Sequence, residues 1–114
     1  MNNEKKTALE MLEDVRTSRN CHDVVLQIMQ LAMMNKDVIE INVRYQCNVD
    51  YVDVRVYLAG TEYGREQSPI YKSNVYLDRN SFEDDTPPLT QLLRIEDKLL
   101  ELIAEAKDKA EVAA

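Results

Sequence analysis

The residue types that most often carry chemistry are sparse in this sequence. His22 is the only histidine, and Cys21 directly precedes it. Adjacent residues on a helix point about 100° apart, so this pair would make a poor metal chelate. Nucleophilic catalysis by the thiol would need a nearby base and a group that orients that base, and the sequence shows neither. We therefore expect His22 to be a partly exposed polar residue.

Two other segments have the wrong composition for ligand binding. Gly60 and Gly64, with Arg65, lack the Gly-Lys-Ser/Thr that completes a phosphate-binding loop, and we interpret both glycines as turn residues. The acidic run at residues 83–85 lacks the glycine turn and ligand spacing of a calcium loop. It precedes a predicted helix, whose N-terminus favours negative charge. We expect no catalytic residue, no cofactor and no metal, and a protein that is not an enzyme.

Length and composition indicate one globular domain over residues 1–114, with residues 1–4 and 110–114 frayed. The chain has 114 residues, of which 45% are hydrophobic and 31% charged. Its formal net charge is −7. Binding to a phosphate backbone draws its affinity from Lys and Arg, so this charge disfavours a nonspecific nucleic-acid binder. It is compatible with simple solubility, with a basic partner, or with imitation of nucleic acid.

The sequence predicts a cytoplasmic protein with no membrane partner. No apolar run approaches the roughly 20 residues that span a bilayer, and the first residues lack the apolar segment of a signal peptide. The only two cysteines, Cys21 and Cys47, make no disulfide framework. We interpret both as small buried hydrophobic residues.

Hydrophobic spacing predicts helix over residues 4–34. Residues 17–20 are a weak point, because Asn20 is a good N-cap and Asp23 completes a short capping box. Both one kinked helix and two shorter ones, the second from Cys21 to about Asn35, fit the pattern. Met29, Met33 and Met34 are soft apolar residues, typical of adaptable surfaces and of cores. We place Met33 and Met34 in the core, at the junction of helix and sheet.

The spacing then changes to the alternation of strands. Residues 38–47 and 51–58 form a predicted hairpin around the turn at 48–50, and residues 70–77 form a third strand after a polar loop at 59–69. The inward positions are Ile39, Ile41, Val43, Tyr45 and Cys47 in the first strand, Val52, Val54, Val56 and Leu58 in the second, and Tyr71, Ser73, Val75 and Leu77 in the third.

An acidic connector at residues 78–86 leads to a last helix, which begins at Pro87-Pro88 and continues to about Lys109. The order is therefore one or two helices, three strands and a helix. We predict an α+β fold, a two-layer sandwich in which a three-stranded antiparallel meander is covered by the N-terminal and C-terminal helices.

The last helix has an apolar arc wider than packing against one layer requires. One interpretation is a helix wedged between the sheet and the N-terminal helix. The other is that one side of the arc meets a partner helix, most simply that of a second copy. The candidate interface is Leu92, Ile95, Leu99, Leu102 and Ala106, and a second apolar seam lies beside it at Leu89, Leu93, Leu100 and Ile103.

The outward face of the sheet is the second candidate surface. It combines basic and aromatic residues, which hold single-stranded nucleic acid by phosphate contact and base stacking. The same cross-strand pairs also stabilise a solvated sheet that binds nothing, and Glu40 and Asp53 dilute the positive charge. The candidate binding residues on this face are Arg44, Arg55, Lys72, Tyr51, Tyr57 and Tyr76.

The function expected from these patterns is contact without catalysis. We predict a protein–protein interaction or regulatory domain that forms a homodimer through the last helix, binds another protein, or does both. A nucleic-acid-related accessory protein is the alternative, either binding single strands on the sheet face or competing with nucleic acid through its acidic surface. A small enzyme with an unrecognised site is the third hypothesis.

Overall fold

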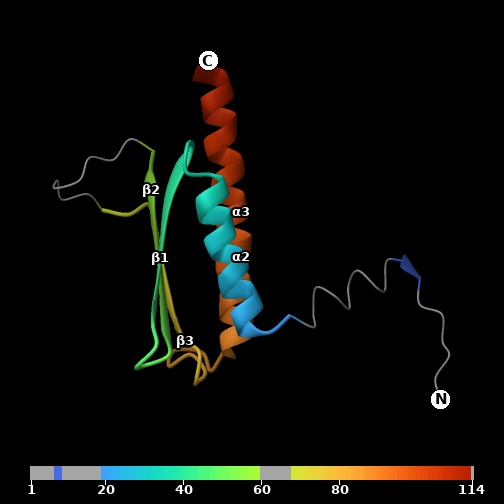
Figure 1. The fold of residues 1–114 in the computed structure, drawn as a ribbon, viewed down its shortest axis with the longest axis vertical. Coiled ribbons are helices and arrows are strands. Elements are labelled where there is room, and N and C mark those ends of the chain that lie inside the picture. The colour runs from blue at the N-terminus through green and yellow to red at the C-terminus, as the bar shows by residue number, and fades with distance from the viewer. Residues whose placement is uncertain (1–6, 9–18, 60–67, 114) are drawn as a thin grey trace.

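The structure is a computed structural model that describes residues 7–8, 19–59 and 68–113 (Figure 1). Most of the predicted helical stretch before Asn20, together with Gly60, Gly64 and Arg65, lies outside the described residues. The described elements are α2 (Cys21–Met34), β1 (Ile39–Gln46), β2 (Tyr51–Leu58), β3 (Tyr71–Tyr76) and α3 (Pro88–Ala113). The predicted α+β fold, with its order of helix, three strands and helix, is confirmed.

Helix α2 begins where the capping residues predict. The Asn20 side chain accepts a hydrogen bond of 2.9 Å from the backbone N–H of Asp23, and the Asp23 carboxylate accepts one of 3.1 Å from the Asn20 N–H. Each bond satisfies a donor that the first helical turn leaves unpaired. At the other end, the Asn35 side chain donates to the carbonyl oxygen of Leu31 at 2.8 Å. Polar side chains thus define both ends of α2.

The three strands form one antiparallel sheet in the order β1-β2-β3. Gln46 is opposite Tyr51 in the first pair of strands, and Tyr51 is opposite Tyr76 in the second. In the β1–β2 turn, Asp50 has a φ of 50° and its carboxylate accepts a hydrogen bond of 2.6 Å from the Tyr45 hydroxyl. Aspartate tolerates this left-handed conformation better than most residues, so Asp50 suits its position in the turn.

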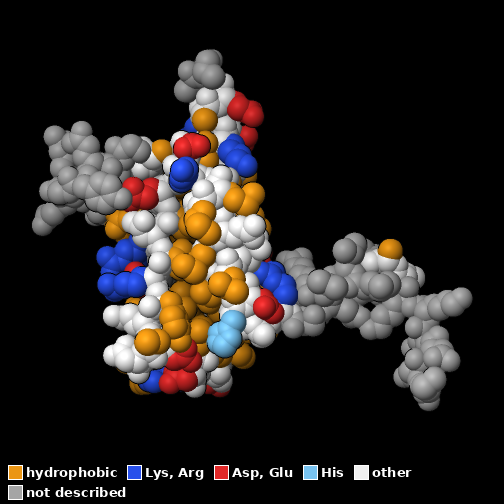
Figure 2. All heavy atoms as spheres, in the orientation of Figure 1, with side chains coloured by type: hydrophobic (Ala, Val, Ile, Leu, Met, Phe, Trp, Pro, Cys, Tyr) orange, Lys and Arg blue, Asp and Glu red, His pale blue; other side chains and the backbone are white. Residues whose placement is uncertain are grey.

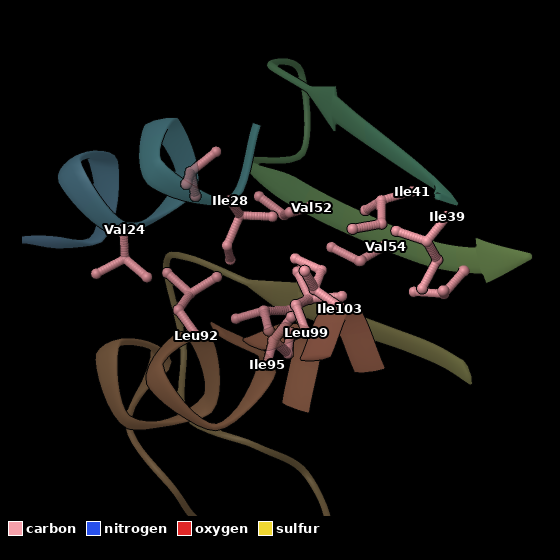
Figure 3. Close-up of a cluster of buried hydrophobic side chains, with 13 residues drawn as sticks. Val24, Ile28, Ile39, Ile41, Val52, Val54, Leu92, Ile95, Leu99 and Ile103 are labelled. Atoms are coloured by element: carbon pink, nitrogen blue, oxygen red, sulfur yellow. The ribbon is translucent and has the colours of Figure 1, made fainter. Parts of the chain in front are cut away.

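Helices α2 and α3 lie side by side on one face of the sheet, and α3 continues past the end of α2 (Figure 1). The core lies between the two layers, and Figure 3 shows side chains from α2, α3 and the strands converging there. It consists of Val24, Val25, Ile28, Ile39, Ile41, Val52, Val54, Val56, Val75, Leu92, Ile95, Leu99 and Ile103.

Several residues that the sequence patterns place inside the protein are exposed in the structure. Met33 and Met34 are 68% and 72% exposed, so their placement in the core is wrong. Tyr45 and Leu58, near strand ends, are exposed too, and Cys47 is exposed where a buried residue was expected. The period-2 pattern specifies the face of a strand but not how far along the strand the helices cover it.

We expect Leu99→Ala to lower the free energy of unfolding by about 2–5 kcal/mol, because the shorter side chain leaves a cavity. Leu99 is 0% exposed, whereas its neighbour Leu100 is 48% exposed. Leu100→Ala is therefore the matched control and should cost less than about 1 kcal/mol. Urea unfolding followed by circular dichroism measures both. Equal losses for the two variants would contradict the packing described.

Candidate interaction surfaces

The candidate interface on the last helix is largely occupied by the chain's own core. Leu92, Ile95 and Leu99 are buried, whereas Leu102 and Ala106 are only half-buried against the core. A second copy could not reach the first three without opening the core. The structure therefore corrects the choice of Leu92, Ile95 and Leu99 as contact residues, because α2 and the sheet together cover the row that they form. Self-association itself stays a prediction.

The buried row of α3 also contains a carboxylate, that of Glu96. Arg19, just before α2, donates two hydrogen bonds to it, of 3.0 and 2.6 Å. Bidentate, charge-assisted hydrogen bonds of this kind compensate for the free-energy cost of removing the carboxylate from water. The bond to Glu96 raises the pKa of Arg19 above its ordinary value. This ion pair holds Arg19, which precedes α2, against α3.

The outward face of the sheet brings the predicted basic and aromatic residues together in cross-strand rows. Tyr51 is opposite Tyr76, with ring centroids 4.9 Å apart, and Arg55 is opposite Lys72. The Arg79 guanidinium, from the connector after β3, lies 4.7 Å from the centroid of the Tyr76 ring. Arg44 and Tyr57 lie on the same face, opposite Asp53 and Glu40.

Acidic groups on this face offset much of its positive charge. Asp53 is only 5% exposed, and its carboxylate accepts a hydrogen bond of 3.1 Å from Arg55. Glu40 accepts one of 3.2 Å from the Asn42 side chain. Burial, and next the charge of Asp53, raise the pKa of Tyr51. The face is therefore a mixed-charge surface with one aromatic corner.

The connector between β3 and α3 forms one side of a groove. The groove has a volume of about 650 Å³ and is bounded by β3, the connector and the first turns of α3. Asp84 in its wall accepts a hydrogen bond of 3.2 Å from the Thr86 N–H and lies 3.4 Å from the Arg94 guanidinium. Hydrogen bonds from the Thr86 hydroxyl and N–H, with smaller contributions from Ser81 and Arg94, lower the pKa of Asp84 from 3.8 to about 2.

That environment is unsuited to acid–base catalysis at neutral pH. A carboxylate with a pKa of about 2 is a weaker base than an ordinary aspartate. The acidic run at residues 83–85 instead organises the chain ahead of α3, where Asp85 adopts a φ of 58° and donates its N–H to the Ser81 carbonyl oxygen at 3.0 Å. The expectation that this run favours the N-terminus of α3 by its negative charge stays a prediction.

Cys21 and His22 lie at the start of α2, whereas Cys47 follows the end of β1. His22 is exposed at the start of α2, and Cys21 beside it is half-buried. Burial raises the pKa of the Cys21 thiol, which favours the unreactive protonated form. Among residues 7–8, 19–59 and 68–113, no group of three histidine, cysteine, aspartate or glutamate side chains is placed to hold a metal.

A surface that the sequence patterns did not single out lies on α2 and the neighbouring strand. Leu26, Met29 and Met33 are exposed and recur at the 3 and 4 spacing of one helix face. Figure 2 shows hydrophobic side chains gathered along this side of the molecule. The methionines were a visible signal, but their nearness to the strand suggested burial. We call Leu26, Met29 and Met33, together with Val43 and Tyr45 of β1, the α2–β1 face.

Comparison with known proteins adds no further constraint on the site: no family model, no curated protein and no solved structure matches this chain. Within the described ranges, no helix is long and apolar enough to cross a membrane.

We expect the stability of the protein to fall as the pH is lowered from 3.8 to about 2, in part because Asp84 is protonated. The folded-state pKa lies below the ordinary value, so the ionised carboxylate contributes stability above pH 3.8 that is lost as the pH falls through 2. Asp84→Asn keeps an acceptor oxygen and cannot titrate. Its thermal midpoint should therefore fall less than that of the unmodified protein over this interval. Identical pH dependences would show that Asp84 is not held as described.

Proposed function

We propose that this protein is a noncatalytic protein–protein interaction domain that acts by contact and associates with itself. The observation that carries the proposal is the α2–β1 face, where three large apolar side chains of one helix are exposed side by side. Contiguous exposed apolar side chains on a small domain mark binding surfaces, because burying them against a partner is favourable. Methionine suits such a surface because its flexible side chain adapts to the partner.

The titratable groups support this choice over an enzyme. Asp84 has a lowered pKa, and the Cys21 thiol a raised one, and both shifts make the group a weaker base or nucleophile. The net charge of −7 also favours a protein or a basic partner over a phosphate backbone. We place the protein in the cytoplasm, since Cys21 and Cys47 are both free thiols.

We expect the apparent mass of the full chain, measured by sedimentation equilibrium, to rise with concentration from the 13.2 kDa of one chain toward twice that value. Met33→Glu should weaken this association, because it puts a charge into the apolar stripe of Leu26, Met29 and Met33. Glu101→Gln, on an exposed position of α3, is a control that changes charge elsewhere. A mass that stays at one chain up to millimolar concentration would contradict self-association.

The outer sheet face favours a second function, binding of single-stranded nucleic acid. Tyr51 and Tyr76, whose rings are tilted by 52°, form an aromatic and cationic corner there with Arg79. Arg44, Arg55 and Lys72 lie on the same face along the strands. Aromatic rings beside cations hold bases and phosphates in this way. Tyr57 lies at the opposite end of the same face.

For this second function, we expect an oligonucleotide to bind at low salt and to be released as salt rises, because phosphate contacts displace counterions. Arg44→Ala should weaken that binding several-fold, whereas Lys107→Ala, near the far end of α3, should not. Fluorescence anisotropy of a labelled single strand measures both. Absence of binding at low salt would remove this function and leave the proposed interaction domain untouched.

A further inference from the structure

The edge strands of the described sheet are β1 and β3. The pattern of hydrogen bonds between the strands shows which backbone groups of each edge strand point away from the sheet. The Asp50 and Val56 carbonyl oxygens accept bonds of 2.8 Å from Leu77 and Ile70, so even-numbered residues of β2 point their backbone groups toward β3. Backbone groups alternate along a strand, so Tyr51, Asp53, Arg55 and Tyr57 bond to β1.

The partners of these residues on β1 are Gln46, Arg44, Asn42 and Glu40. The other β1 residues therefore point their backbone groups away from the sheet. The Ile39 N–H agrees with this alternation, since it donates a hydrogen bond outside the sheet to the Asn35 carbonyl oxygen at 3.1 Å. Ile41, Val43 and Tyr45 remain as a row of backbone donors and acceptors that β2 does not use, and an edge of this kind is a template for another strand.

This edge adjoins the exposed stripe of α2. Val24 of α2 points toward Leu92 of α3 in Figure 3. A helix turns about 100° per residue, so Met29 and Met33 lie about 140° and 180° around α2 from Val24, on the flank away from α3. Val43 and Tyr45 of β1 complete the α2–β1 face. A strand added to β1 would therefore bring its own covering helix against this stripe.

We infer that the occupant of the β1 edge is β1 of a second copy of this chain, antiparallel and centred on Asn42; this inference rests on the proposed self-association. In that register Ile41 is opposite Val43 of the second copy, and both use outward-pointing backbone groups. Glu40 is then opposite Arg44 of the second copy, and two-fold symmetry repeats the pair. Opposite charges directly across antiparallel strands stabilise the pairing.

Other registers and the other edge lack this match. Centring the pair on Ile41 or Val43 leaves Glu40 and Arg44 opposite amides or outside the pair. A shift by two residues from Asn42 would place Glu40 opposite Glu40, or Arg44 opposite Arg44, and like charges there are unfavourable. On the β3 edge, residues 71–76 contain Lys72 and no carboxylate, so self-pairing there makes no ion pair. The charges of β1 thus select one edge and one register.

The resulting dimer joins two three-stranded sheets into a continuous sheet of six strands. Both helical layers lie on the same face, because the two-fold axis is perpendicular to the sheet. The Leu26, Met29 and Met33 stripes of the two copies then meet across that axis. Pairing of the strands provides direction and register, and the apolar stripes provide the buried area.

The first test is a crosslink through Asn42, with Cys21 and Cys47 replaced by serine. In the inferred register Asn42 faces Asn42 of the second copy as a non-hydrogen-bonded pair, with Cα atoms about 4.5 Å apart. That separation suits a disulfide. Asn42→Cys should therefore form a crosslinked dimer under mild oxidation at least tenfold faster than Asn74→Cys, the exposed equivalent at the middle of β3.

The second test reverses charges. Glu40→Arg and Arg44→Glu, each alone, should raise the dimer dissociation constant about tenfold, because each places like charges across the two-fold axis. An equimolar mixture of the two variants should recover association as a heterodimer, since opposite charges again face each other. Lys107→Glu, near the end of α3, is the charge-matched control. Thermal unfolding of each variant verifies that the monomer remains folded.

The outcomes separate the inference from the proposed function. Slow crosslinking at Asn42 in a protein that still dimerises would overturn the β1 register and retain self-association. Faster crosslinking at Asn74 would assign the contact to β3, and weakening by Lys107→Glu would assign it to α3. Failure of the mixed variants to associate would also overturn the inferred ion pair. A protein that is monomeric at every concentration would overturn both proposals together.

Discussion

Helix α3 packs against both α2 and the sheet, because its row of buried side chains closes the core between them. Leu92, Ile95 and Leu99 are all within that core, and Ile103 extends the row by another turn. Glu96 lies in the same row and is compatible with it only because Arg19 supplies two hydrogen bonds. The position of α2 on the sheet, and hence which of its faces is left exposed, depends on this packing.

The two faces of the sheet have different physical roles as a result. The inner face carries valines and isoleucines that the two helices cover, whereas the outer face carries paired charges and tyrosines. Burial of Asp53 beside Arg55 shows that long side chains on an open sheet cover one another. The outer face is therefore stabilised by its own contacts without needing a ligand, and the apolar surface that lacks a cover in the described chain is on α2 and β1.

The sequence patterns were most successful where local geometry decides the outcome. Asn20 and Asp23 predicted the start of α2, and Pro87-Pro88 predicted the start of α3 to within one residue. They were wrong where coverage by another element decides it, as at Met33, Met34 and Cys47. Leu92, Ile95 and Leu99 show the converse. Their spacing revealed a wide apolar arc but could not say whether the chain itself or a second copy fills it.

The sequence by itself determined the secondary structure, the inward and outward alternation of the strands and the class of fold, because helix caps and hydrophobic periods act between near neighbours. Only the tertiary structure decided which apolar residues are core and which are surface, because burial depends on where α2 and α3 settle over the sheet. It also decided which backbone groups of β1 point away from β2, since that depends on which residues of β2 form their hydrogen bonds with β3. The charges of Glu40 and Arg44 are visible in the sequence, but their spacing can select a strand register only because β1 is an edge strand of the described sheet.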